Sequence, residues 1–89
     1  MAQQFYSPLQ LNGTLTVGAD DTGHDVKFYG ATSGRYLLWD ESQDRLEFTD
    51  NVKATFGTSA DYEIYHNGTN SFIANHTGDL IIDSAADDK

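Results

Sequence analysis

Three histidines are the side chains of this 89-residue chain best suited to bind a transition metal: His24, His66 and His76. Zinc and iron bind imidazole nitrogens at about 2.1 Å and need several ligands close together. No His-x-His or Glu-x-x-His spacing supplies such a pair. We therefore predict no cofactor. The metal-ligand candidate is His66, because a threefold axis of a trimer can bring three copies of this side chain together around one ion. In the competing interpretation, His66 forms local hydrogen bonds beside the Asn67-Gly68 turn.

Two acidic groups are the next chemical feature, and their members are Asp20, Asp21 and Asp25, then Asp40, Glu41 and Asp44. Neither group has the Asp-x-Asp-x-Asp-Gly spacing of a calcium loop. Glycoside hydrolysis by Asp40 and Asp44 needs two carboxyl groups about 5 to 9.5 Å apart in a cleft, which the sequence does not indicate. Nucleophile-elbow, Walker and dinucleotide motifs are also missing from the sequence. We therefore predict that the protein is not an enzyme.

Four aromatic residues near carboxylates are candidates for contact with a receptor or glycan: Tyr29, Tyr36, Trp39 and Tyr65. Aromatic rings stack on the apolar faces of sugars, while acidic groups accept hydrogen bonds from sugar hydroxyls. The competing interpretation is cross-strand pairing of aromatic side chains within a sheet. Tyr29 and Tyr65 are each preceded by a hydrophobic, charged, hydrophobic run, and this shared pattern favours an architectural role for that pair.

Short runs that alternate between apolar and polar residues must position all of these side chains. They predict eight strands, near residues 11–17, 26–29, 36–39, 45–48, 52–56, 62–65, 72–74 and 80–82. Glycine-containing turns such as Asn12-Gly13 and Asn67-Gly68 separate them. No segment has the spacing of an amphipathic helix. The sequence therefore predicts an all-β fold of short antiparallel strands.

The strands fall into a unit of four that is used twice. The runs at 15–18, 26–29, 36–38 and 46–48 match runs that lie 39, 36, 36 and 34 residues later. We divide the chain into a lead segment (1–12), a first β repeat (13–50), a second β repeat (51–84) and an acidic tail (85–89). Stacked repeats normally need about three or more units to bury a continuous core. Two units therefore predict completion by further chains.

Composition supports the same expectation. Hydrophobic residues make up 38% of the chain, and the cysteine count is zero, so disulfides and thiolate metal sites are excluded. A domain of this size has a marginal core and usually needs disulfides, metals or partner subunits. The net charge of −9 argues against nucleic acid and anionic lipid as partners. No apolar run is long enough to insert into a membrane, and the start lacks the pattern of a signal peptide.

Two stretches resemble a known family. The run YEIYHNGTNSFI at 62–73, followed by TGDLII at 77–82, resembles a repeat in virion structural proteins of tailed phages, especially marine and cyanobacterial phages. That pattern reads roughly IYHDGSNSYI followed by GTGDLYI. The stretch 17–40 is similar to another segment of those proteins. Asn67 stands where the pattern commonly has Asp, and Phe72 where it has Tyr.

The resemblance implies a module of a tail fibre or spike, located in the virion after synthesis in the host cytoplasm. Such modules are typically homotrimers with intertwined β-structure, and their partners are other virion proteins and host-surface glycans. We therefore expect an intertwined homotrimeric fibre of the β-prism or β-helix type. Alternatives on the same scaffold are a carbohydrate- or receptor-binding tip and a capsid decoration protein. The expected trimer core consists of Leu15, Val17, Phe28, Leu38, Leu46, Phe48, Phe56, Ile64, Phe72, Leu80 and Ile82.

Overall fold

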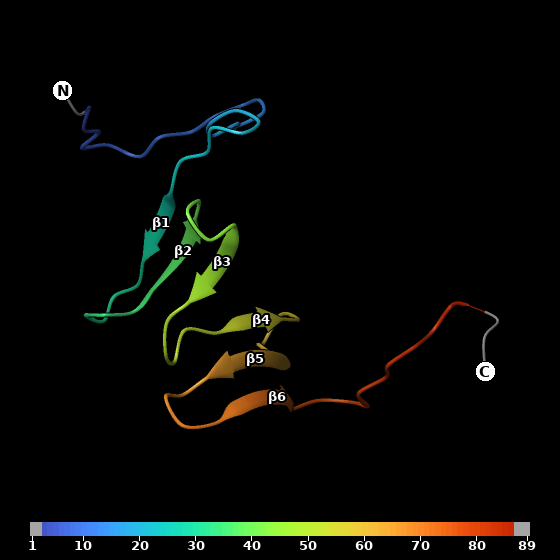
Figure 1. Ribbon diagram of the computed structural model, residues 1–89. Helices are drawn as coiled ribbons and strands as arrows, with labels where there is room; N and C mark the ends of the chain where they lie inside the picture. Colours follow the sequence, from blue (N-terminus) through green and yellow to red (C-terminus); the bar gives the residue numbers. More distant parts are fainter. Residues whose placement is uncertain (1–2, 87–89) are drawn as a thin grey trace.

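The computed structural model describes residues 3–86 and contains two antiparallel sheets of three strands each (Figure 1). In chain order the strands are β1 (Val26–Tyr29), β2 (Tyr36–Asp40), β3 (Arg45–Phe48), β4 (Ala54–Phe56), β5 (Tyr62–His66) and β6 (Ser71–Asn75). The strand order within the sheets is β1-β2-β3 and β4-β5-β6, so each sheet is a simple meander. Residues 3–86 include no helix. The prediction of an all-β fold with short antiparallel strands is confirmed.

Alternation of side chains gives the β1-β2-β3 sheet one strongly apolar face. Phe28 pairs with Leu37, which pairs with Phe48 on its other side. Directly opposite residues in a sheet point to the same side. The first apolar face, as we call it, consists of Val26, Phe28, Leu37, Trp39, Leu46 and Phe48.

The β4-β5-β6 sheet has a corresponding face. Ile64 lies between Ala54 and Ile73, and Phe56 pairs with Tyr62. The rings of Phe56 and Tyr62 are 5.7 Å apart between centroids. The second apolar face, as we call it, consists of Ala54, Phe56, Tyr62, Ile64 and Ile73.

The strand registers change the apolar row that we expected from the sequence. Leu38 pairs with Lys27, and Phe72 pairs with Tyr65, so both point away from the apolar faces of their sheets. Leu37 and Ile73 take their places. The runs around these residues are apolar at consecutive positions, and alternation therefore gave no basis for choosing between the two faces.

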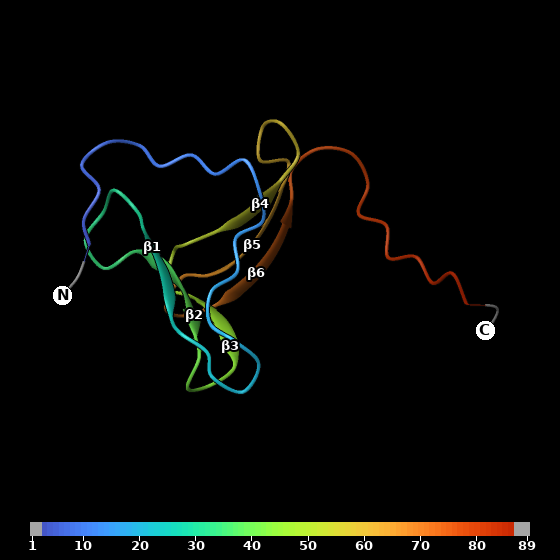
Figure 2. The same cartoon turned by 90° about the horizontal axis from the view of Figure 1, so that it is seen from above.

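Two of the eight expected strands are not formed, so the sheets have three strands where the repeat predicted four. Residues 15–17 and 80–82 pair with no strand in the part of the chain that the structure describes. Eight residues separate residue 17 from β1, whereas only five, Gly57–Asp61, connect β4 to β5. After β6 the chain leads away from its sheet in both views (Figures 1 and 2). The paired strands therefore end at β1 on one side and at β6 on the other.

Backbone conformation nevertheless recurs at the spacing of the sequence repeat. Gly18 and Gly57 have φ of 82° and 92°, and Asp21 and Ala60 have φ of 67° and 55°. Each pair is 39 residues apart. Both turns therefore use left-handed residues at the same two positions, although only the second turn leads from one paired strand to the next.

One chain has no buried interior. None of the side chains of residues 3–86 is buried, and the accessible surface is 8044 Å². A compact monomer of 9.8 kDa has an accessible surface of roughly 5,200 Å². The radius of gyration of 17.4 Å compares with about 12 Å for a compact domain of this length. The chain thus exposes about 2,900 Å² more than a self-contained domain.

Ala60 tests the role of the left-handed turn. Alanine pays a steric penalty at the observed φ of 55° that glycine avoids. We expect Ala60→Gly to stabilise the protein by about 0.5–1 kcal/mol after the entropic cost of glycine. Ala54→Gly, within β4, is the matched control and should destabilise by a similar amount. Equal destabilisation by both variants in chemical denaturation would show that the turn imposes no such conformation.

Candidate functional site

A lysine lies over two tyrosine rings on the face of the first sheet opposite its apolar face. The rings of Tyr29 and Tyr36 form an edge-on pair with centroids 6.0 Å apart. Lys27 Nζ is 4.3 Å from the centroid of Tyr36 and 5.2 Å from that of Tyr29. Cation–π contacts of this kind hold an ammonium group against aromatic faces. Two of the four glycan-contact candidates therefore form a cross-strand aromatic pair.

The second sheet has a similar aromatic pair, but its lysine comes from a different segment, since the repeat places Glu63 at the position of Lys27. Tyr65 and Phe72 pair across β5 and β6, with nearly parallel rings and centroids 4.8 Å apart. Lys53 Nζ is 4.6 Å from the centroid of Tyr65. The two aromatic pairs occupy equivalent places in the repeat, which agrees with the architectural interpretation of Tyr29 and Tyr65.

Trp39, the fourth aromatic candidate, has different surroundings. It lines an open hollow of about 460 Å³ between the turn at 19–23 and the connection that follows β2. Val17 also lines this hollow, and Trp39 is 39% exposed. The acidic lining residues are Asp20, Asp21, Glu41 and Asp44. The hollow thus brings an exposed indole and several carboxylates together, and glycan contact by Trp39 stays a prediction.

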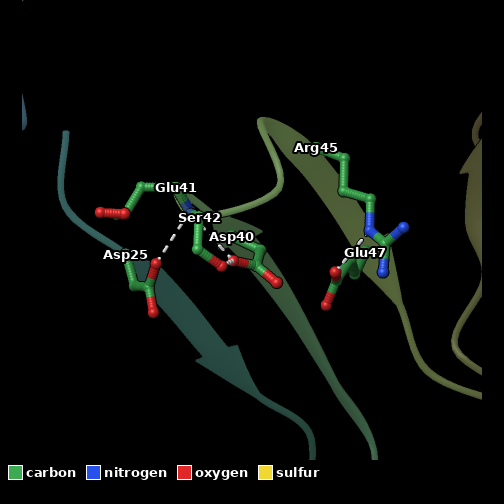
Figure 3. Close-up of polar contacts among 6 residues, drawn as sticks. All are labelled: Asp25, Asp40, Glu41, Ser42, Arg45 and Glu47. Carbon is green, nitrogen blue, oxygen red and sulfur yellow. Dashed lines mark hydrogen bonds and ion pairs between the residues drawn. The ribbon is translucent and has the colours of Figure 1, made fainter. Parts of the chain in front are cut away.

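Hydrogen bonds fix the acidic loop between β2 and β3 (Figure 3). Asp25 Oδ1 accepts the backbone N–H of Glu41 at 2.9 Å. Asp40 Oδ1 accepts the hydroxyl of Ser42 at 2.7 Å and its N–H at 3.1 Å. The hydroxyl bond from Ser42 lowers the pKa of Asp40. These two carboxylates therefore act as structural acceptors that hold the loop closed, and Asp40 is engaged within its own hairpin.

Arg45 and Glu47 form an ion pair along β3, with 2.6 Å between Nε and Oε2 (Figure 3). The bond to Glu47 raises the pKa of Arg45. The pair is largely exposed on the arginine side, and exposed pairs contribute little to stability. It organises the surface next to Asp40 without forming a pocket of its own.

His66, the metal-ligand candidate, makes local contacts at the end of β5. Its Nδ1 accepts the N–H of Gly68 at 3.0 Å and lies 3.4 Å from Asp50 Oδ1. Residues 3–86 contain no group of three or more His, Cys, Asp or Glu side chains that could hold a metal ion. The contacts match the turn interpretation of His66, and the threefold arrangement stays a prediction.

The most shielded charge cluster was not predicted from the sequence. Glu63 Oε1 lies 3.3 Å from both Lys53 Nζ and His76 Nε2, and the Glu63 side chain is only 13% exposed. The hydrogen bond from His76, followed by that from Lys53, lowers the pKa of Glu63. The alternation of β5 indicated that Glu63 points away from Ile64, but it could not indicate that Lys53 and His76, from other segments, meet it there.

The chain stands apart in comparisons with known proteins: no family model, curated protein or solved structure matches it. The likeness to phage virion proteins therefore depends on the quoted sequence stretches alone. Within residues 3–86 there is also no helix long and apolar enough to cross a membrane.

The Glu63 cluster predicts a pH dependence of stability. Because the folded pKa lies below the unfolded value, the ionised carboxylate stabilises the fold above the unfolded pKa of about 4.3. That contribution is lost as the pH falls through the folded pKa. Glu63→Gln should therefore lower the melting temperature near pH 7 and leave little difference near pH 3. Glu41→Gln, an exposed glutamate outside the cluster, is the control, and melting curves between pH 3 and 7 provide the measurement. An unchanged difference across that range would contradict the prediction.

Proposed function

We propose that the chain is a non-enzymatic structural module of a phage virion appendage, of the tail-fibre or spike type. The chain assembles into a homotrimer that supports host attachment. The observation that carries this proposal is the absence of any buried side chain among residues 3–86, although the sheets have strongly apolar faces.

The size of the exposed surface supports assembly with further copies. Phe28 is 63% exposed, Phe48 is 41% exposed and Ile73 is 66% exposed, and all three lie on the apolar faces defined above. Soluble monomers rarely expose contiguous apolar patches of this extent. The surplus surface of about 2,900 Å² falls in the range buried by obligate interfaces, about 2,000–5,000 Å². Packing against copies of itself therefore accounts for both apolar faces.

Charge complements this arrangement. The Lys27 and Lys53 clusters, Glu63 and the Arg45–Glu47 pair all lie on the sheet faces opposite the apolar faces. Three chains around one axis can place their apolar faces inward and these polar faces outward, so that the net charge of −9 per chain stays in water. Chain entanglement raises the barrier to unfolding, which suits a fibre exposed to shear and proteolysis. The quoted sequence resemblance supplies the virion context, with other virion proteins as partners.

Sedimentation equilibrium tests the homotrimer. Three chains of 9.8 kDa should give about 29 kDa. Phe48→Asp places a charge on the first apolar face and should reduce the mass to that of one chain, because an unpaired buried charge costs several kcal/mol. Tyr29→Asp, on the opposite face of the same sheet, is the matched control and should retain the trimer mass. A folded wild-type monomer would refute the proposal, and a trimeric Phe48→Asp variant would exclude Phe48 from the interface.

The hollow beside Trp39 favours a second candidate function on the same scaffold, a tip that binds carbohydrate on the host surface. This function requires Trp39, a member of the first apolar face, to stay accessible, so it is an alternative to assembly through that part of the face. We expect Trp39→Ala to reduce glycan binding at least tenfold. An aromatic side chain on which a ligand ring stacks contributes on the order of 1–3 kcal/mol to the free energy of binding. Tyr65→Ala, which alters an aromatic pair remote from the hollow, should leave binding unchanged. A glycan array probed with the wild type and both variants provides the test. No specific wild-type signal would remove this function and leave the structural role in place.

A further inference from the structure

Within residues 3–86, strand β6 has a free edge, and the apolar segment Leu80–Ile82 that follows it is not paired with that edge in one chain. We propose that Leu80–Ile82 of one copy adds as a fourth, antiparallel strand to β6 of a neighbouring copy. This strand exchange rests on the homotrimer of the proposed function. In a ring of three chains, each chain donates one strand and receives one, so that no copy is left incomplete.

Both components are exposed in one chain. Strand β6 pairs with β5 on one side, and no strand of residues 3–86 pairs with its other side. An unpaired edge presents a row of backbone donors and acceptors to any extended segment. Leu80, Ile81 and Ile82 are 49%, 77% and 92% exposed. The segment leads away from β6 in both views, in a position to reach another molecule (Figures 1 and 2).

The first sheet shows how the fourth strand fits, because β3 already occupies the equivalent place on β2. There Phe48 pairs with Leu37, and Leu46 pairs with Trp39. The sequence repeat moves the β2 positions by 36 residues and the β3 positions by 34.

Applying these offsets gives a definite register for the exchange. The expected pairs are Ile73 with Ile82, Ala74 with Ile81, and Asn75 with Leu80. Ile73 belongs to the second apolar face, so this register extends that face with Leu80 and Ile82. An open hollow of about 540 Å³ lies at this end of the sheet, lined by Tyr62, Asn75, Asp79 and Leu80–Ile82. In the exchange, Leu80–Ile82 of the neighbouring copy takes the place beside Tyr62 and Asn75 that the chain's own segment lines here.

The connection after β6 has the same length as the loop between β2 and β3, yet the segment Leu80–Ile82 does not pair with its own sheet. Four residues, 41–44, connect β2 to β3, and four residues, 76–79, separate β6 from Leu80. The repeat offsets place Thr77 and Gly78 at the tip of this connection. A two-residue hairpin that matches strand twist needs a positive φ at its first residue. Gly78 has φ of 78°, but Thr77, a β-branched residue, is not among the residues with positive φ. Thr77 therefore disfavours a tight hairpin turn here, in agreement with a segment that leaves its own sheet.

Engineered cysteines test the exchange in an otherwise cysteine-free chain. We expect oxidised Ile73→Cys/Ile82→Cys protein to give a covalent band of three chains on a non-reducing gel. Ile73→Cys/Ile81→Cys is the matched control. It should give little of this band, because a shift of one residue places the two thiols on opposite faces. Sedimentation of the reduced samples shows whether each variant retains the assembly.

A turn variant provides a second, independent readout. Thr77→Asn creates an Asn-Gly pair, which favours the type I′ hairpin turn. In the Ile73→Cys/Ile82→Cys background it should shift the disulfide from between chains to within one chain, with at least a severalfold loss of the covalent trimer. Thr77→Val preserves β-branching and should leave the cross-linking pattern unchanged.

The outcomes separate this proposal from the proposed function. A disulfide within single chains, in protein that sediments as a trimer before any turn variant is made, overturns strand exchange and leaves the trimeric module intact. Free thiols in a sedimenting trimer overturn the register and the exchange together. A monomer with an internal disulfide overturns both proposals. Covalent trimers from Ile73→Cys/Ile82→Cys, but not from Ile73→Cys/Ile81→Cys, support both strand exchange and the trimeric module.

Discussion

A sheet needs a second layer over its apolar face, and this chain does not provide one. Each sheet has three short strands, and the exposed fractions of Phe28, Phe56 and Ile73 all exceed one half. Hydrophobic burial is the largest favourable contribution to folding, and small domains have little to spare. In the proposed homotrimer, further chains supply the missing layer, and folding then depends on protein concentration.

The turns are the next determinant, because each one decides whether the chain returns to the strand that it has just left. The four-residue loop at 41–44 is closed by Asp40 and Asp25 and brings β3 back to β2. Two short apolar segments, at 15–17 and 80–82, remain unpaired within the described residues. The chain thus forms two three-stranded sheets and has one unpaired apolar segment before β1 and another after β6. Spare segments next to open edges are the material from which exchanged assemblies form.

The sequence predicted the class of fold and most strand positions because alternation and glycine turns are local signals. It could not predict strand register in runs such as Tyr36-Leu37-Leu38-Trp39, which are apolar on both sides, and Leu38 was therefore placed on the wrong face. Among the site residues, the pairing of Tyr29 and Tyr65 with neighbouring aromatic rings followed from the repeat. The meeting of Glu63 with Lys53 and His76 did not, since it depends on three segments converging.

The two faces of each sheet differ in chemistry: one is apolar, and the other is mostly polar and aromatic. The face opposite the apolar one carries the lysine–aromatic contacts and the shielded Glu63 cluster, which hold their own sheet together without any partner. In the proposed homotrimer, contacts that rigidify short strands in advance reduce the conformational entropy lost on assembly. The described residues expose both faces of each sheet, the apolar one including Trp39 and the opposite one with its lysine–aromatic contacts. In the proposed homotrimer, this separation assigns the apolar faces to assembly and the opposite faces to contact with the surroundings.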